Sequence, residues 1–221
     1  MPTAAATTTP GVVSTAVSKE EQEQYALSLN AKLKVSQTGK NIHVVWGKIP
    51  GADGYDVYAQ YCGKRFTEKS AIAIKGGKTT KAAIKKVNGK ALDLKKNYRV
   101  YILAYKLVDG KKITLAKTIT AHIVGKNNTK YTNVKEVRVK KSTCTLKKGK
   151  TAKIKAAATL VEKGKKQLTN AHARQFRYAS DNKKVAAVSA KGTIKAVGAG
   201  RCTIYVYARN GYAKKVKVTV K

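Results

Sequence analysis

Tyrosine side chains that alternate with apolar ones are the residues of this chain with the clearest capacity to bind a ligand. The sequence contains 12 Tyr but only 2 Phe and 1 Trp. In the segment NYRVYILAY, Tyr101 and Tyr105 have the parity opposite to Val100, Ile102 and Ala104. Successive side chains of a β-strand point to opposite faces of the sheet. We therefore expect both tyrosines on an exposed sheet face.

A second pair of tyrosines follows the same rule near the C-terminus. Tyr205 and Tyr207 alternate with Ile204, Val206 and Ala208, so they too are expected on an exposed face. With neighbouring basic residues, such faces would form aromatic and cationic platforms for sugars, sulfated glycans or a protein partner. The interpretation we favour is structural, with lysine stems packing on the rings to cover the sheet, and the platform is the alternative. The candidate ligand-contact residues are Arg99, Tyr101, Tyr105, Tyr205, Tyr207 and Arg209.

Catalytic signatures are missing from the sequence. It has no Gly-x-Ser-x-Gly and no His-Glu-x-x-His segment, which would indicate a serine hydrolase or a zinc hydrolase. The segment IKGGKTT ends like a phosphate-binding loop, but Ile72 occupies the place of the loop's first glycine. We therefore expect no enzymatic activity and assign no catalytic residue.

Residues that could bind a metal are scattered along the sequence. His43, His122 and His172 are far apart and have no acidic neighbours, so each is expected alone at the surface. Asp53 and Asp56 flank Gly54 but offer fewer oxygen ligands than a calcium site needs. We expect neither a metal nor a cofactor.

The three cysteines, Cys62, Cys144 and Cys202, are odd in number and widely spaced, unlike a zinc site or a disulfide framework. Cys144 shares the parity of Leu146 and Cys202 that of Ile204, so both are expected to be buried. We expect free thiols. The alternative is a disulfide between Cys144 and Cys202, and Cys62 stays single in either case.

The charge of the chain is extreme, with 47 Lys+Arg against 11 Asp+Glu and a formal net charge of +36. Dispersed lysine protects sheet edges from aggregation, and it also attracts polyanions. Because no groove-binding helix or single-strand platform is evident, nucleic acid is expected to bind only non-specifically. The expected partners are anionic glycans, wall polymers or host glycoproteins. No apolar run reaches the roughly 20 residues of a membrane helix, so no membrane insertion is expected.

The pattern of the chain predicts short strands throughout. NIHVVW places Ile42, Val44 and Trp46 on one face, and turn signals such as PGADG and VDGKK separate successive runs. Strands with this spacing are typical of a β-sandwich or barrel. Asn210-Gly211 between two alternating runs predicts a terminal hairpin. We expect no amphipathic helix.

Composition divides the chain into two modules. Residues 1–24 are rich in Thr and Ala and are interpreted as a linker or tether with a short ordered stretch at the Glu/Gln cluster. Residues 25–126 form the first predicted sandwich, residues 127–130 a polar linker, and residues 131–221 the second sandwich. We expect a rod-like, monomeric fragment of a longer chain whose modules fold independently.

The first module resembles a fibronectin type III domain. The resemblance rests on the inward Trp46, on PGADGYDVY, and on LDLKKNYRVYILAY, in which Leu92 and Tyr98 stand as in the family's tyrosine-corner segment. It implies structural roles for Trp46 and Tyr98.

The second module resembles a bacterial immunoglobulin-like domain of group 2, a type found in intimin- and invasin-like surface proteins. The resemblance rests on the segments TLKKGKT, YASDNKKVAAVSAKGTIKAVGAGRCTIYVYA and the terminal KVKVTV. Tyr178 stands where the family usually has tryptophan, which implies a change of core packing in detail only.

Together, the pattern and the resemblances predict an all-β protein of two tandem immunoglobulin-like β-sandwiches of the Greek-key type. They imply a non-enzymatic adhesion or display module of a bacterial cell-surface or secreted protein, which binds or presents a binder of glycans or glycoproteins. The first residues lack the pattern of a signal peptide, so export would depend on a signal outside this sequence. The alternative is an accessory spacer region of a large extracellular carbohydrate-active enzyme or peptidase. A third interpretation makes binding of anionic glycans or wall polymers the main role.

Overall fold

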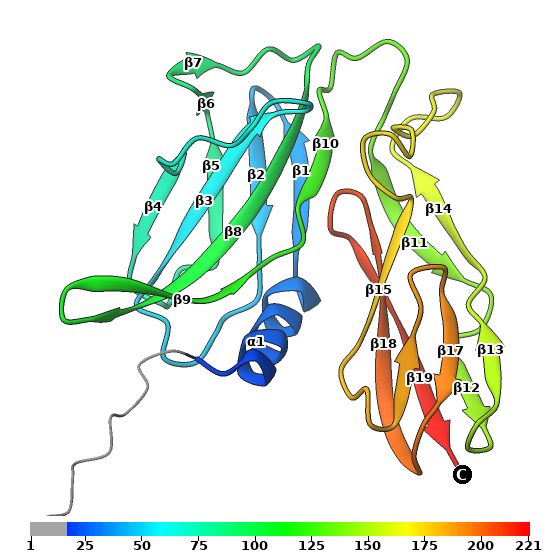
Figure 1. Ribbon diagram of the computed structural model, residues 1–221. Helices are drawn as coiled ribbons and strands as arrows, with labels where there is room; N and C mark the ends of the chain where they lie inside the picture. The colour runs from blue at the N-terminus through cyan, green and yellow to red at the C-terminus, as the bar shows by residue number, and fades with distance from the viewer. Residues whose placement is uncertain (1–16) are drawn as a thin grey trace, which may run out of the picture.

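A computed structural model describes residues 17–221, which form two β-sandwiches (Figure 1). Each module has its own apolar core, one built from residues of the N-terminal half and one from residues after 130. The predicted all-β fold of sandwich modules is confirmed. Most of the predicted tether lies outside the described residues. No helix among residues 17–221 has the length and apolar character needed to cross a membrane.

Module one consists of two sheets and a small hairpin. The first sheet has the order β1 (Lys34–Thr38), β2 (Asn41–Val45) and β5 (Lys81–Ile84). The second has the order β10 (Ala121–Val124), β8 (Asn97–Val108), β3 (Gly54–Tyr61) and β4 (Ile72–Lys75), and β9 (Lys111–Lys117) also pairs with β8. A two-stranded hairpin is made by β6 (Lys86–Val87) and β7 (Lys90–Ala91).

Large aromatic side chains lie at the centre of module one. Trp46 is 1% exposed and contacts Tyr55 edge-on, with ring centroids 5.4 Å apart. Tyr98 is fully buried, and its hydroxyl donates a hydrogen bond to the carbonyl oxygen of Asp93 at 3.0 Å. This bond satisfies the one polar group that a buried tyrosine brings into a core. Strand alternation predicts the burial of both Trp46 and Tyr98.

Module two is built from three sheets. The largest has the order β12 (Thr143–Leu146), β19 (Ala213–Val220), β18 (Gly200–Ala208) and β15 (Phe176–Ser180). A second has the order β13 (Thr151–Lys153), β17 (Thr193–Ala196) and β16 (Ala186–Val188). The third pairs β11 (Val134–Val139) with β14 (Ala156–Leu160). The hairpin predicted at Asn210-Gly211 joins β18 to β19.

Strand order explains why two cysteines of module two are free thiols. Cys144 in β12 and Cys202 in β18 both lie opposite Val218, because β19 runs between their strands. Strands are spaced about 4.8 Å apart, which puts the two Cα atoms about 10 Å apart, beyond the roughly 7 Å that a disulfide can span. Cys202 is buried as expected, whereas Cys144 is only half-buried because β12 is an edge strand.

A helix is the clearest departure from the predicted fold. Helix α1 (Lys19–Ala31) begins within the segment interpreted as a tether, at the Glu/Gln cluster where a short ordered stretch was expected, and no helix was predicted there. Ser18 caps it: its hydroxyl accepts from the backbone of Glu21, whose carboxylate accepts from the backbone of Ser18. This capping box is a recognised start signal in sequences. The apolar stripe of the helix is weak, so the spacing of its apolar residues does not indicate a helix.

Helix α1 belongs to module one. The backbone N–H of Gly47 donates to the carbonyl of Leu29 at 2.9 Å, and the side-chain oxygen of Asn30 accepts from the N–H of Ile119 at 2.9 Å. A Cβ atom on Gly47 would lie 1.8 Å from the carbonyl oxygen of Ser28, so only glycine permits this approach. Residues before 25 therefore pack on module one as part of α1.

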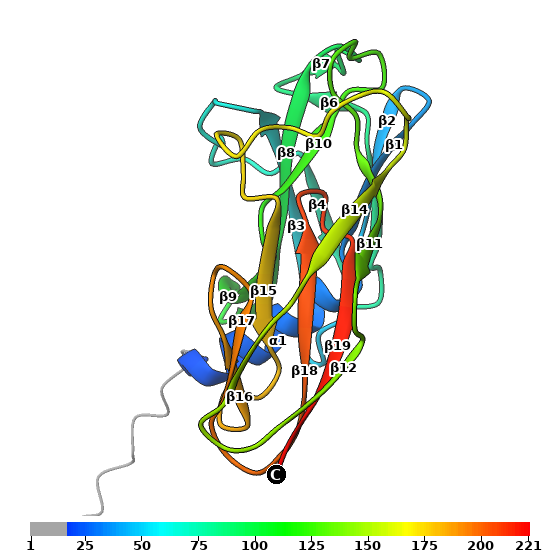
Figure 2. The same cartoon turned by 90° about the vertical axis from the view of Figure 1, so that its right-hand side faces the viewer.

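The two modules lie side by side, and the expectation of a rod is wrong (Figures 1 and 2). The N–H of Val35 donates to the carbonyl of Asn210 at 3.0 Å, and the N–H of His122 donates to the carbonyl of Arg209 at 2.8 Å. Arg177 of β15 donates through Nη1 to the carbonyl of Thr120 at 2.8 Å. The turn between β18 and β19 is thus hydrogen-bonded to β1 and β10 of module one.

Acidic residues of α1 extend this contact. Glu23 forms an ion pair with Lys183, and Glu20 lies 3.8 Å from Lys184. These glutamates belong to the small acidic minority of a strongly basic chain, and they face basic residues of module two. A groove of about 900 Å³ remains between α1 and module two, so this part of the interface is incompletely packed.

Candidate ligand-binding face and cysteine–histidine cluster

Tyr101 projects from the outer face of the β3–β8 sheet, where alternation predicted it. Its register partner in β3 is Tyr58, and the two rings stack with centroids 4.7 Å apart and planes 12° from parallel. Both side chains are half-buried. Strands β3 and β8 therefore present an aromatic pair rather than a single tyrosine on this face.

Three further side chains complete the group. Phe66 meets the Tyr101 ring edge-on at 4.6 Å, and the guanidinium of Arg99 lies 4.5 Å from the Phe66 centroid. The ammonium of Lys117 lies 3.8 Å from the Tyr101 centroid. We call Tyr58, Phe66, Arg99, Tyr101 and Lys117 the aromatic face.

The geometry of the aromatic face suits a flat ligand that carries negative charge. Strands β3 and β9 pair with opposite edges of β8, so Tyr101 is flanked by Tyr58 on one side and by Lys117 on the other. The exposed ammonium of Lys117 can leave the ring, because exposed cation–π contacts contribute only about 0.5–1 kcal/mol. Its departure would open the ring face and provide a cation beside it.

Tyr105, by contrast, is not exposed, and its predicted place on an open face is wrong. Only 3% of it is accessible. Its register partner is Gly54, which has no side chain, so the ring folds over the glycine and the hydroxyl donates to the carbonyl of Ile74 at 3.3 Å. Lys112 covers the ring at 4.1 Å and forms an ion pair with Asp56 at 2.7 Å.

We expect Gly54→Ala to destabilise module one by about 1–3 kcal/mol, the usual cost of overpacking a filled site. A Cβ atom there would lie 2.3 Å from both the Ile74 carbonyl oxygen and the Tyr105 hydroxyl. Chemical denaturation measures the change. Gly39→Ala cannot serve as the control, because Gly39 has a φ of +57° and alanine would be strained there. The control is Ala73→Gly, an exposed position on the adjacent strand β4. An unchanged midpoint for Gly54→Ala would contradict the placement of Tyr105.

The second predicted platform is also largely buried. Tyr207 is 2% exposed and Arg209 6% exposed, so their predicted exposure is wrong. Tyr205 alone is half-buried, and it stacks on Tyr207 with centroids 5.9 Å apart. For Tyr207 the cause is the position of module one, which approaches β15 and the turn after β18. The side chain of Arg209 is instead enclosed by the loop between β14 and β15. Tyr178, which replaces the expected tryptophan, is half-buried against Gly192 and packs on the core of module two.

Arg209 has a positioning role in the structure. Its guanidinium donates to the Ala173 carbonyl through Nε at 2.9 Å, to Gln167 through Nη1 at 3.0 Å and to Asn170 through Nη2 at 2.9 Å. These bonds fix the loop between β14 and β15. Burial lowers the pKa of Arg209.

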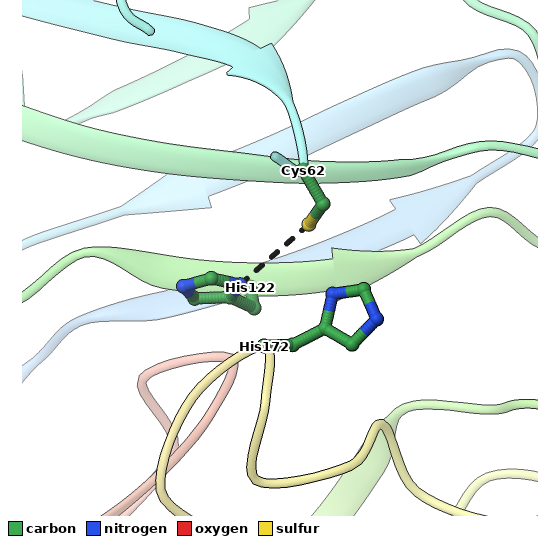
Figure 3. Close-up of side chains that lie close together, drawn as sticks. All are labelled: Cys62, His122 and His172. Atoms are coloured by element: carbon green, nitrogen blue, oxygen red, sulfur yellow. Dashed lines mark hydrogen bonds between the residues drawn. The ribbon is translucent and has the colours of Figure 1, made fainter. Parts of the chain in front are cut away.

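The loop held by Arg209 brings His172 close to His122 and Cys62 (Figure 3). One ligating atom from each of the three side chains lies within 4.8 Å of the others, and Cys62 Sγ is 3.6 Å from His122 Nδ1. The expectation that the histidines are isolated from one another is therefore wrong for His122 and His172. Cys62, expected to remain single, has two histidines as neighbours.

The surroundings of this cluster are cationic. Burial, followed by the charges of Arg177 and Arg99, lowers the pKa of His122 to about 4, so its imidazole is neutral at physiological pH. Burial raises the pKa of the Cys62 thiol to about 11, although the charge of Arg99 opposes the shift. His122 lies directly opposite Arg99 in the β8–β10 ladder, which connects the cluster to the aromatic face.

Comparisons with solved structures return low similarities. The S-layer protein rSbsC(31-844) is 15% identical with a TM-score of 0.35 over 81% of this chain and 22% of that one. The FN1–FN3 domains of chicken CNTN1 are 11% identical with a TM-score of 0.32, over 85% and 64% of the two chains. A C-terminal intimin fragment in complex with the translocated intimin receptor is 13% identical with a TM-score of 0.28, over 86% and 64%. The chain thus spans about a fifth of the S-layer protein chain.

The family comparison is specific to the second module. No curated protein matches the sequence. The bacterial Ig-like domain (group 2) family matches residues 133–220, which agrees with the resemblance of module two. The family match does not extend into module one, whose fibronectin type III character stays a prediction. Residues 133–220 therefore match the bacterial Ig-like domain family of group 2, joined in one chain to a second β-sandwich.

Proposed function

We propose that this chain is a non-enzymatic module of a bacterial surface or secreted protein, and that its aromatic face binds an anionic glycan. The stacked pair Tyr58–Tyr101, flanked by Arg99 and Lys117, is the observation that carries the proposal. Support for the surface location comes from the match of residues 133–220 to the bacterial Ig-like domain family.

Selectivity in this proposal depends on placing charge beside aromatic rings. A charge-only surface attracts every polyanion, and its interactions are screened beyond about 8 Å at physiological salt. Ring faces carry a partial negative charge and can stack against the C–H groups of a sugar ring. The acidic group of the same sugar would take the place of the Tyr101 ring as the partner of Lys117. A host glycoprotein or a wall polymer bearing such sugars would be the natural source.

Binding of a heparin-derived oligosaccharide by calorimetry tests the proposal. We expect Tyr101→Ala to weaken binding by about 1 kcal/mol, roughly fivefold in Kd, because it removes the stacked ring. Lys117→Gln is expected to weaken binding and to reduce its salt dependence, because it removes one contact that releases counterions.

Matched controls exist elsewhere in the chain. Tyr205→Ala removes a half-buried, stacked tyrosine from module two, and Lys85→Gln removes one exposed lysine outside the aromatic face. Both are expected to leave the affinity within twofold of the original. Equal losses for Tyr101→Ala and Tyr205→Ala, or equal losses for the two lysine variants, would show that the binding is a diffuse charge effect.

A further inference from the structure

The cluster of Cys62, His122 and His172 combines one thiol with two imidazoles at a single point between the modules (Figure 3). Thiolate and imidazole are the ligands that copper and zinc prefer in proteins. A three-coordinate centre with bonds of about 2.0–2.3 Å places its ligand atoms about 3.7 Å apart. The 3.6 Å between Cys62 Sγ and His122 Nδ1 already has this value. His172 is exposed, so its ring can rotate to shorten the remaining separations, which reach at most 4.8 Å.

Hydrogen bonds to the surrounding protein fix the backbone of the two histidines. The N–H of His122 donates to the carbonyl of Arg209 at 2.8 Å. The guanidinium of Arg209 binds the Ala173 carbonyl at 2.9 Å, next to His172, and the N–H of His172 donates to Thr169 at 3.1 Å. Arg209 thus holds the backbone of His122 through its carbonyl and the backbone beside His172 through its guanidinium.

Net charge decides which ion fits. Arg99, Arg177 and Arg209 all lie near His122, and a centre with added positive charge is disfavoured beside them. A monovalent copper ion and one thiolate add no net charge, whereas Zn²⁺ with one thiolate adds one positive charge. Structural zinc sites also use four protein ligands as a rule, and this cluster has three.

We propose that Cys62, His122 and His172 bind one Cu(I) ion and that this ion joins the two modules. Binding replaces the thiol proton of Cys62 with the metal, and the proton leaves to the solvent; copper keeps its oxidation state. Cys62 and His122 belong to module one and His172 to module two, so the ion would cross-link the interface already formed at Arg209 and Asn210.

Competition with a chromophoric Cu(I) chelator under anaerobic conditions tests this in the full chain. We expect one Cu(I) per chain, with X-ray absorption showing one sulfur and two nitrogen neighbours. Cys62→Ser and His172→Ala should each lower the affinity by more than the roughly 10- to 100-fold that loss of an outer-shell partner costs. Cu(I) should also raise the melting temperature of the unaltered chain but not that of His172→Ala.

Two variants serve as matched controls. His43→Ala removes the histidine outside the cluster, and Cys144→Ser removes a half-buried thiol of module two; both should bind Cu(I) as the unaltered chain does. Melting without metal confirms that each variant is folded. Copper affinity that survives both Cys62→Ser and His172→Ala, or tighter binding of Zn²⁺ than of Cu(I), would overturn the proposal.

Discussion

Trp46→Ala is expected to lower the stability of module one by about 3–5 kcal/mol, the usual cost of truncating a large buried aromatic side chain. Trp46 is 1% exposed and packs against Tyr55 at the centre of the core. In a module of this size, such a loss corresponds to a fall in Tm of roughly 15 °C or more. Calorimetry of the full chain measures it on the transition of module one.

Tyr101→Ala is the comparison for this variant, because Tyr101 lies on the outer face of the same module and is only half-buried. Its loss removes two ring–ring contacts and a cation–π contact rather than core volume. We expect a cost below about 2 kcal/mol. Equal losses for the two variants would contradict the assignment of inner and outer faces in module one.

Separating the modules is expected to weaken each one without unfolding it. The fragments 17–126 and 130–221 have separate apolar cores, so each should unfold cooperatively. The interface contributes hydrogen bonds at Val35, His122 and Arg177, each of which stabilises by about 0.5–1.5 kcal/mol. Fragment 130–221 should therefore be about 2–4 kcal/mol less stable than the same module in the full chain.

Chemical denaturation of both fragments and of the full chain gives this difference. Arg177→Met in the full chain is an intermediate case, because it removes one interface bond, together with two bonds to the carbonyls of Ala208 and Arg209, and keeps much of the side-chain volume. A fragment as stable as the intact module would show that the side-by-side contact contributes nothing. A fragment that fails to fold would contradict the prediction of independent folding.

The strands of this protein could be predicted from its sequence because period-two alternation determines which side chains are buried. Trp46, Tyr98 and Cys202 occupy buried places that follow from their neighbours' parity. The turn at Asn210-Gly211 is also local in origin. Helix α1 has a local signal as well, the capping box of Ser18 and Glu21, which is independent of hydrophobic periodicity.

Side chains whose burial depends on distant parts of the chain could not be placed in this way. Tyr105 is covered because Gly54 lies opposite it, and Tyr207 is covered because module one packs beside module two. Arg209 is covered by the loop between β14 and β15. Parity gave the correct sheet face for Tyr105 and could not reveal what covers it. These burials are tertiary in origin.

In the candidate sites, too, some residues could be predicted from local sequence and others are brought together only by the tertiary fold. Tyr58 could have been found, since it has the outward parity of its strand, but its pairing with Tyr101 depends on the register of two distant strands. Phe66 comes from a loop and has no periodic signal. Cys62, His122 and His172 meet only because two strand ends and a loop of the other module converge, which their wide separation in the sequence conceals.

We propose that the aromatic face, and not the overall charge, recognises a glycan. Amide chemical shifts measured by NMR while a heparin-derived oligosaccharide is added at about 1 M salt, where charges are screened beyond about 3 Å, test it most directly. We predict that the surviving shifts cluster at Tyr58, Phe66, Arg99, Tyr101 and Lys117. Shifts that vanish at this salt concentration, or that spread evenly over the lysines of both modules, would contradict the claim.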